Sequence, residues 1–306
     1  MKILEKCEIC GRNDFMGLFT QWDKNLSIKK YFKMQKCKNC GIIFLNPQPS
    51  FNDLREHYSK NKYYSLGRIN KGVKSQIRMF FYHLYYSKNK NFLLMALLSP
   101  LKFYFRGAKV IQNGKILDIG AGSGQFLYEM KKLGMNVYGI EPGEFDKRES
   151  LNIFHGDLNK AGYSSNFFDV VSMNHVLEHI NNPKETLREV YRILKKGGNF
   201  ILAVPNTNSF ASHLFGKEWY QWDVPRHLFN YSDNLLLKIL KKEGFKDIKL
   251  EYNSKPSQFV VSMTYLFNLN RKNRMMRTFL SIFFLPLTYL VNFLGKGDQI
   301  EIICKK

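Results

Sequence analysis

Three glycines and a carboxylate in the middle of the chain have the types and spacing of a ligand-binding turn. Gly120, Gly122 and Gly124 follow an apolar run, and Glu141 ends the next apolar run. Glycine lets the backbone bend tightly and lets a ligand approach where a Cβ would block it. A carboxylate at the end of the neighbouring strand can accept hydrogen bonds from both hydroxyls of a ribose. The pattern therefore predicts a strand, a turn, a helix and a second strand that form a nucleoside-binding crevice.

The spacing of the glycines separates two classes of nucleoside ligand. A dinucleotide fingerprint, G-x-G-x-x-G, would place its third glycine where this chain has Gln125. The observed G-x-G-x-G, preceded by Asp118, resembles motif I of the class I S-adenosylmethionine-dependent methyltransferases. Later segments resemble, in the same order, the fourth strand of that family, the segment after it and the fifth strand with its preceding turn: residues 168–173, 175–180 and 192–206. This resemblance covers roughly residues 115–253, and the ordered motifs are far more specific than one glycine turn.

The resemblance implies a fold, a cofactor and the residues that bind the cofactor. The fold is α/β, a Rossmann-like, doubly wound, seven-stranded sheet with an antiparallel last strand, which we expect at the sheet edge. The cofactor is S-adenosylmethionine, with the glycines around its amino-acid part and Glu141 on its ribose. The implied contacts are Asp118, Gly120, Gly122, Gly124, Glu141, Asp157 and Asn174. Because few residues separate Glu141 from the third strand, we expect a second helix of about two turns or fewer. Asp157 has two interpretations, a contact to the adenine amino group or an exposed helix-capping residue.

Histidines and a glutamate after the predicted fourth strand are candidates for the chemical step. An alcohol acceptor must lose its proton during methyl transfer. His175, Glu178 and His179 are spaced i, i+3, i+4 and would share one face of a helix. His227, on the insertion after the fifth strand, is the best candidate for the general base. The same four residues resemble the metal site of methyltransferases that act on vicinal hydroxyls, with His175 in place of a glutamate. This leaves three alternatives, which are a base, a Mg or Mn site, and a structural tie between strand and helix.

The loop around His227 offers further groups for an acceptor. Arg226 could bind a phosphate or carboxylate of the acceptor. Trp219 and Trp222 could stack on the face of a sugar or a base.

Four cysteines near the start of the chain have metal-ligand spacing. Cys7 and Cys10 form one C-x-x-C-G pair, and Cys37 and Cys40 form another. Such knuckles suit a tetrahedral Zn²⁺ held by four thiolates, a closed site with a structural role. The alternative is two redox or disulfide pairs, which the charged start of the chain and the lack of a secretory apolar region disfavour. We expect the zinc site to be remote from catalysis.

The pattern of the sequence divides the 306 residues into three parts. Residues 1–46 resemble a zinc ribbon, 47–108 a helical linker or cap, and 109–306 a methyltransferase domain with insertions at 207–232 and 254–297. The apolar patterns of the last part predict strands at 115–120, 136–141, 153–156, 168–173, 199–204, 246–252 and 299–304. They predict helices near 124–133, 183–195 and 233–243.

Charge and two apolar stretches bear on partners. The chain has 47 Lys and Arg against 25 Asp and Glu, a net charge of +22, which favours anionic partners. The stretch 279–294 follows the basic residues Arg271, Lys272, Arg274 and Arg277. At ~1.5 Å per residue it would reach only about 24 Å, short of the ~30 Å hydrocarbon core. Either it and the stretch 92–105 lie in a membrane interface, or they pack together as a buried cap over the acceptor site, which we favour because buried helices are commoner.

The parts together predict a cytosolic methyltransferase with an N-terminal zinc ribbon. Their order resembles bacterial methyltransferases of surface polysaccharides and sugars, so we expect a small-molecule or glycan acceptor, O-methylated on a sugar or lipid-linked glycan. The membrane alternative would place the enzyme on the inner face of the membrane. An RNA methyltransferase is the second interpretation, although a base-flipping motif of the Asn-Pro-Pro-Tyr kind is absent from the sequence. A zinc-ribbon adaptor on an inactive methyltransferase fold is the third, and the intact glycines and Glu141 argue against it.

Overall fold

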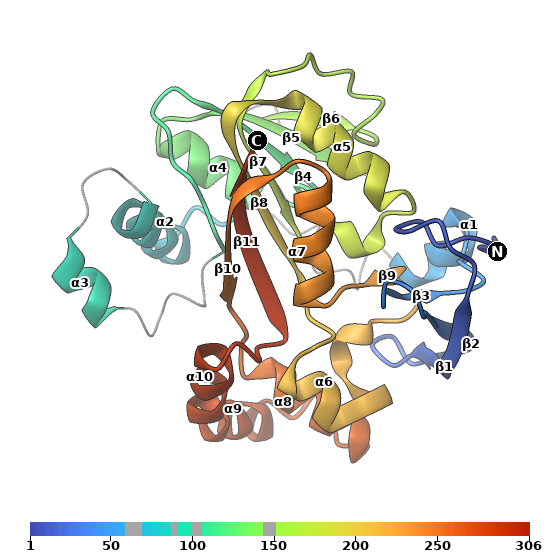
Figure 1. Ribbon diagram of the computed structural model, residues 1–306. Helices are drawn as coiled ribbons and strands as arrows, with labels where there is room; N and C mark the ends of the chain where they lie inside the picture. The colour runs from blue at the N-terminus through green and yellow to red at the C-terminus, as the bar shows by residue number, and fades with distance from the viewer. Residues whose placement is uncertain (59–68, 87–90, 99–105, 143–150) are drawn as a thin grey trace.

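A mixed sheet of seven strands forms the centre of the computed structural model, which describes residues 1–58, 69–86, 91–98, 106–142 and 151–306 (Figure 1). The strand order is β10-β11-β8-β7-β4-β5-β6. The pairs among β8, β7, β4, β5 and β6 are parallel, whereas β11 is antiparallel to β8 and β10. The bounds are β4 Lys115–Ile119, β5 Asn136–Glu141, β6 Asn152–His155, β7 Phe168–Asn174, β8 Leu194–Pro205, β10 Lys246–Tyr252 and β11 Gln299–Lys305. The predicted fold is confirmed, with the correction that β10 forms the edge and β11 lies one strand inside it.

Helices pack on both faces of this sheet. Successive residues of a strand point to opposite faces, so each central strand contributes side chains to two cores. Ile116 and Val170 are buried in one core with residues of α2 and α4, whereas Leu117 and Val171 are buried in another with residues of α5 and α7. These helices are α2 Val73–Tyr86, α4 Gln125–Lys132, α5 Pro183–Ile193 and α7 Asp233–Lys242. Continuous apolar runs such as residues 200–204 of β8 are therefore expected, since the central strands are buried on both sides.

Two ends of elements differ from the sequence prediction. The helix expected to reach residue 195 ends at Ile193, because Leu194 is already extended with ψ 140°. β8 then begins at Leu194 and passes through Gly197, whose φ of 73° favours glycine.

The N-terminal part forms a second, antiparallel sheet that takes its last strand from the methyltransferase part. Its order is β1-β2-β3-β9, with bounds β1 Phe15–Asp23, β2 Ile28–Cys37, β3 Ile43–Leu45 and β9 Phe229–Asn230. Phe44 of β3 pairs with Phe229 of β9, and their ring centroids are 6.2 Å apart. The predicted division of the chain into residues 1–46, 47–108 and 109–306 stays a prediction, although this sheet combines strands from the first and the last part.

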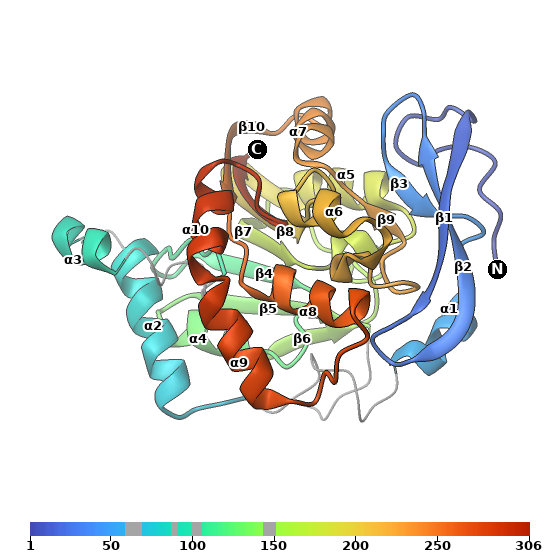
Figure 2. The same ribbon diagram turned by 90° about the horizontal axis from the view of Figure 1, so that it is seen from below.

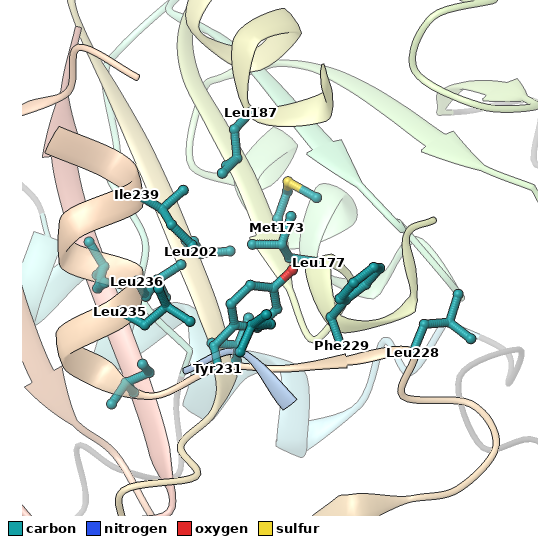
Figure 3. Close-up of a cluster of buried hydrophobic side chains, with 14 of the residues drawn as sticks. Met173, Leu177, Leu187, Leu202, Leu228, Phe229, Tyr231, Leu235, Leu236 and Ile239 are labelled. Atoms are coloured by element: carbon teal, nitrogen blue, oxygen red, sulfur yellow. The ribbon is translucent and has the colours of Figure 1, made fainter. Parts of the chain in front are cut away.

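The segment that follows β9 and the helix α7 share one apolar core with β7 and β8. Figure 3 shows the ring of Tyr231 among apolar side chains of these elements, including Met173, Leu202 and Leu236. The residue after β9 is thus packed into the core of the methyltransferase sheet. The chain between His227 and Tyr231 is therefore held by both sheets.

The remaining helices lie in the segment between the sheets and in the two insertions, except for η4, which follows β7. They are α1 Phe51–Leu54, η1 Arg55–Tyr58, α3 Phe92–Leu97, η4 Leu177–His179, α6 Phe210–Phe215, η5 Gly216–Glu218, η6 Tyr220–Trp222, α8 Ser257–Leu266, α9 Arg274–Phe283 and α10 Leu285–Phe293. Of the predicted apolar stretch 92–105, residues 99–105 lie outside the described residues. So does most of the segment predicted to hold the short second helix, 143–150.

Candidate functional site

The glycine turn after β4 has the geometry that the sequence predicts. Gly120, Gly122 and Gly124 have φ values of 72°, 51° and 73°, in the left-handed region that favours glycine. A Cβ on Gly120 would clash with Val176, which follows β7. The N–H of Gly122 donates to Glu141 Oε2 at 2.7 Å, so the carboxylate expected on the ribose lies against the turn. The turn therefore joins the ends of β4, β5 and β7, where an open α/β sheet binds its ligands.

Asp118, expected near the cofactor, is buried and already paired. Arg106 Nη2 donates to Asp118 Oδ1 at 2.7 Å, and the hydroxyl of Ser172 donates to the same oxygen at 2.7 Å. The Arg106 guanidinium also lies 3.7 Å from the ring centroid of Phe126. Sequence reasoning missed Arg106, because a single arginine upstream of the first strand has no spacing that identifies it. The cofactor role of Asp118 stays a prediction.

Two other expected cofactor residues lie at the carboxyl ends of parallel strands of the sheet. Asn174 ends β7 and is half-buried. Asp157 follows β6, is exposed, and accepts a hydrogen bond from the N–H of Lys160 at 3.0 Å. That hydrogen bond lowers the pKa of Asp157. The capping interpretation thus describes Asp157 in this structure, and its contact to adenine stays a prediction.

The structure brings Glu178, His179 and His227 together. One potential ligand atom from each lies within 4.8 Å of the others. The rings of His179 and His227 have centroids 4.8 Å apart, and His227 Nε2 is 3.9 Å from Glu178 Oε1. The expected helix is a 3-10 turn, and His175 precedes it with φ 55°, so the three residues do not share an α-helical face. His175 instead contacts Glu178 Oε1 through Nδ1 at 3.1 Å.

Backbone carbonyls orient both imidazoles of this cluster. His179 Nδ1 lies 2.9 Å from the carbonyl of Arg226, and His227 Nδ1 lies 2.7 Å from the carbonyl of Gln221. A carbonyl only accepts hydrogen bonds, so each Nδ1 carries a proton, and an imidazole held this way has its lone pair on Nε2 in its neutral form. The Oε2 of Glu178 has no hydrogen-bond partner among the described residues. Two lone pairs and a buried carboxylate oxygen are therefore available.

Burial and neighbouring charges set the protonation of the cluster. Burial, together with the charge of His179, lowers the pKa of His227 to about 4. Burial alone would raise the pKa of Glu178, but the hydrogen bond with His175 and the nearby histidine charges hold it at about 2. Burial would likewise lower the pKa of His175, but Glu178 raises it above its ordinary value. At neutral pH, His227 is thus a neutral imidazole beside an ionised carboxylate.

Arg226 is buried and its guanidinium is fully engaged. It donates to Asp223, to the carbonyl of His57, and to Asp23 Oδ2 at 2.7 Å. His57 is buried beside it and contacts Asp23 through Nδ1 at 2.7 Å. An acceptor phosphate would have to displace one of these carboxylates, so the acceptor role expected for Arg226 stays a prediction. Sequence reasoning missed Asp23 and His57.

The expected stacking role of the two tryptophans is wrong. Trp219 and Trp222 are 1% and 7% exposed. Their rings pack edge-to-face with centroids 5.1 Å apart, and Trp222 Nε1 donates to the carbonyl of Gly216 at 2.8 Å. Both side chains therefore serve the core under the loop.

The four N-terminal cysteines form a site that fits zinc. Cys7 Sγ is 3.7 Å from Cys40 Sγ, and Cys10 Sγ is 3.6 Å from Cys37 Sγ. Tetrahedral Zn²⁺ with Zn–S bonds of ~2.3 Å separates its sulfurs by about 3.8 Å. The cysteines are unpaired, which disagrees with the disulfide alternative. The cluster suggests a structural zinc site that these thiolates would hold.

The sheet of this ribbon contacts the His227 loop, whereas the expectation that the zinc site itself is remote from catalysis stays a prediction. β1 ends at Asp23, which pairs with Arg226, and Leu45 at the end of β3 donates its N–H to the carbonyl of Leu228 at 3.1 Å. These contacts lie on both sides of His227 in sequence. The N-terminal sheet therefore supports the loop that carries the candidate base.

The sheet order, the glycine turn and the carboxylate at the end of β5 together define a class I S-adenosylmethionine-dependent methyltransferase. Residues 91–250 match the profile of the methyltransferase domain family Methyltransf_23, about half of the chain, and the protein belongs to this family. It is therefore an S-adenosylmethionine-dependent methyltransferase. The left-handed turn at Gly120, Gly122 and Gly124, with the Glu141 carboxylate against it, fits the expected cofactor, which these residues would hold.

Three comparisons describe the relatives of this domain. An uncharacterized protein of Methanocaldococcus jannaschii is 26% identical over 140 residues, covering 45% of this chain and 68% of that protein. The ubiquinone biosynthesis O-methyltransferase of Maricaulis maris is 32% identical over 137 residues, covering 40% of this chain and 54% of that enzyme. A crystal structure of a SAM-dependent methyltransferase from Archaeoglobus fulgidus is 22% identical, covers 74% of this chain and 98% of that chain, and has a TM-score of 0.46.

Proposed function

We propose that this methyltransferase transfers the methyl group to a hydroxyl oxygen, on a sugar or a lipid-linked glycan. The observation that supports a hydroxyl acceptor is the meeting of Glu178, His179 and His227 beside the glycine turn. Val176, two residues before Glu178, packs against Gly120, so the cluster adjoins the expected position of the methyl donor. A hydroxyl needs such a group because it must lose its proton as the new C–O bond forms.

The cluster has the donor set of a divalent cation. Two imidazole Nε2 atoms and a carboxylate suit Mn²⁺ and related ions, and the backbone carbonyls that orient the rings are the partners that metal-ligating histidines use. A buried carboxylate oxygen without a partner also favours a nearby cation. We assign Glu178, His179 and His227 to hold Mg²⁺ or Mn²⁺. Such an ion would lower the pKa of a bound hydroxyl.

A role for His227 as a base without metal is the competing mechanism. Its pKa of about 4 keeps the ring unprotonated at neutral pH, but it also makes the ring a weak base. Metal binding needs only the unprotonated ring. The meeting of two imidazoles with the unpartnered Oε2 of Glu178, rather than this pKa, favours the ligand role over the base role.

The acceptor class is inferred from the relatives and from the sequence resemblance. Several relatives are named as ubiquinone biosynthesis O-methyltransferases, which supports an oxygen acceptor. The resemblance to methyltransferases of bacterial surface polysaccharides supports a sugar, and with it a cytoplasmic site of action where activated sugars are made. A nucleic-acid acceptor is supported only by the zinc ribbon and the net charge of +22.

Isotope transfer tests this proposal. The enzyme is incubated with methyl-labelled S-adenosylmethionine and separate sugar-nucleotide, lipid-linked sugar and RNA fractions, and the labelled product is treated with hydriodic acid. O-methyl ethers release labelled methyl iodide, whereas C-methyl groups do not. We expect label in a sugar fraction that hydriodic acid releases. Label in RNA, or label that resists release, would overturn the proposal.

Chelation and substitution then separate the two mechanisms. Replacing Glu178 by Gln or His179 by Ala should lower turnover by ~100-fold or more with donor binding intact, and His213→Ala, an exposed histidine on α6, is the matched control. A chelator should abolish turnover while the zinc content stays constant, and Mg²⁺ or Mn²⁺ should restore it. Turnover that survives the chelator but falls in His227→Ala would assign the step to the imidazole. Turnover that survives both would place proton removal elsewhere.

A further inference from the structure

Helices α9 and α10 present an apolar surface to solvent. None of the residues of α9 is buried, and Met275, Phe279, Ile282 and Phe283 are 65% to 85% exposed. Their spacing of i, i+4, i+7 and i+8 places them on one side of the helix. On α10, Leu290 is 51% and Phe293 is 88% exposed. We call these six side chains the α9–α10 face.

On the other side, α10 and the turn that joins it to α9 pack against the protein. Phe284, between the two helices, stacks on Phe259 of α8 with ring centroids 5.1 Å apart. Thr288 and Val291 of α10 are buried. The helices are therefore docked, and their second apolar side faces outward. The expectation that this stretch is a buried cap is wrong for the α9–α10 face.

The charged residues of the segment that carries this face all have one sign. The sequence holds no Asp or Glu between Glu251 and Asp298. Lys272, Arg274 and Arg277 are exposed at the start of the segment. Arg271 is held differently, because its guanidinium donates to the carbonyl of Lys24 and to Ser27 Oγ in the ribbon. Three exposed cations therefore border the apolar surface, and Arg271 ties the segment to the N-terminal sheet.

We propose that the α9–α10 face docks on the surface of an anionic lipid bilayer. Apolar side chains with flanking cations are the pattern of a helix that lies in the membrane interface. A second copy of the chain fits less well, because two faces bordered by the same cations would repel each other in a protein of net charge +22. No single helix within the described ranges is long and apolar enough to cross a membrane, and α9 with α10 passes the length and composition test only as a pair bent by 46°.

The α9–α10 face lies at the same end of the sheet as the glycine turn. α6 follows the end of β8, α8 follows the end of β10, and α10 precedes the start of the antiparallel β11, so these helices gather at one end of the sheet (Figure 1). The glycine turn and Glu178 follow the ends of β4 and β7 at that same end. Figure 2, seen from that end, shows α8, α9 and α10 in front of the sheet. A docked enzyme would therefore have the acceptor side of its site near the membrane. This consequence rests on the proposed function, whereas the docking itself does not.

Vesicle sedimentation with the full chain tests the docking. The probes are vesicles of neutral phosphatidylcholine and vesicles that also contain anionic phosphatidylglycerol. We expect binding to the anionic vesicles at low salt that weakens as the salt rises from about 0.05 M to about 0.5 M. Replacing Lys272, Arg274 and Arg277 by Gln should lower the partition coefficient at least tenfold. Phe279→Ser with Phe283→Ser should lower it by a similar factor, because both rings leave the interface.

A matched variant controls for net charge. Replacing Lys238, Lys241 and Lys242 of α7 by Gln removes the same charge from another exposed surface, and it should change binding less than threefold. Donor binding, measured on every variant, reports that the fold is intact. Absence of anionic-vesicle binding at low salt, or an equal loss in the α7 variant, would overturn the proposal. Concentration-dependent dimers that Phe279→Ser disrupts, without vesicle binding, would assign the face to a second copy instead.

Discussion

Replacing Asp23 should remove the ion pair that joins the N-terminal sheet to the His227 loop. Its carboxylate is 0% exposed, and it lies within hydrogen-bond distance of Arg226, at 2.7 Å and 3.2 Å, and of His57, at 2.7 Å. Removing one partner of a buried ion pair costs about 3 to 5 kcal/mol, because it leaves a buried charge uncompensated. Asp223 still neutralises Arg226, so we take the lower value. Asp23→Ala should therefore lower the free energy of unfolding by about 3 kcal/mol.

Denaturant unfolding followed by tryptophan fluorescence measures this change. The matched control is Asp14→Ala, which removes an exposed pair with Lys38 from the same ribbon and should change stability by less than about 1 kcal/mol. The carbonyl of Arg226 orients His179, so Asp23→Ala should also lower turnover at least tenfold while the affinity for S-adenosylmethionine stays constant. Equal stability of the Asp23 and Asp14 variants would refute the coupling between ribbon and loop.

Three further predictions concern the cofactor, the zinc and pH. Glu141→Ala should weaken S-adenosylmethionine binding at least tenfold, since two hydrogen bonds to a charged group contribute about 2 to 4 kcal/mol, and calorimetry showing an unchanged Kd would contradict the ribose assignment. Cys7→Ser with Cys37→Ser should lose the zinc found by metal analysis and unfold the ribbon, whereas full zinc content would place the ion elsewhere. Burial raises the pKa of Asp298 to about 7. Between pH ~4 and ~7 the folded state therefore binds one proton more than the unfolded state does. The free energy of unfolding should fall by up to about 4 kcal/mol as pH rises through that range. Asp298→Asn should remove this fall, and the same slope in the variant would assign it to other groups.

Local patterns in the sequence predicted the central sheet well. β4 and β5 begin at the predicted residues, because a mainly apolar run followed by glycines or a carboxylate indicates a buried parallel strand. The turn needs a positive φ at Gly120, and the residue type at that position is enough to predict it. The four-cysteine site was equally predictable, because the geometry of the knuckle sets the spacing of its cysteines.

Contacts between distant segments were not predictable in the same way. Asp23 and Arg226 are separated by 203 positions, and no local pattern marks either as a partner of the other. β9 is two residues long and becomes a strand only because β3 lies beside it. The apolar stretch 279–294 indicated helix, but not its division into α9 and α10 or its exposed side, because hydrophobicity alone does not distinguish a buried helix from one that faces a membrane.

The binding of the demethylated donor tests the central claim most directly. That claim places the methyl-transfer site between the glycine turn and the Glu178, His179 and His227 cluster. A crystal structure with S-adenosylhomocysteine should show both ribose hydroxyls on Glu141 and the homocysteine sulfur facing this cluster. A nucleoside bound away from the turn, or a sulfur that faces away from the cluster, would contradict the account.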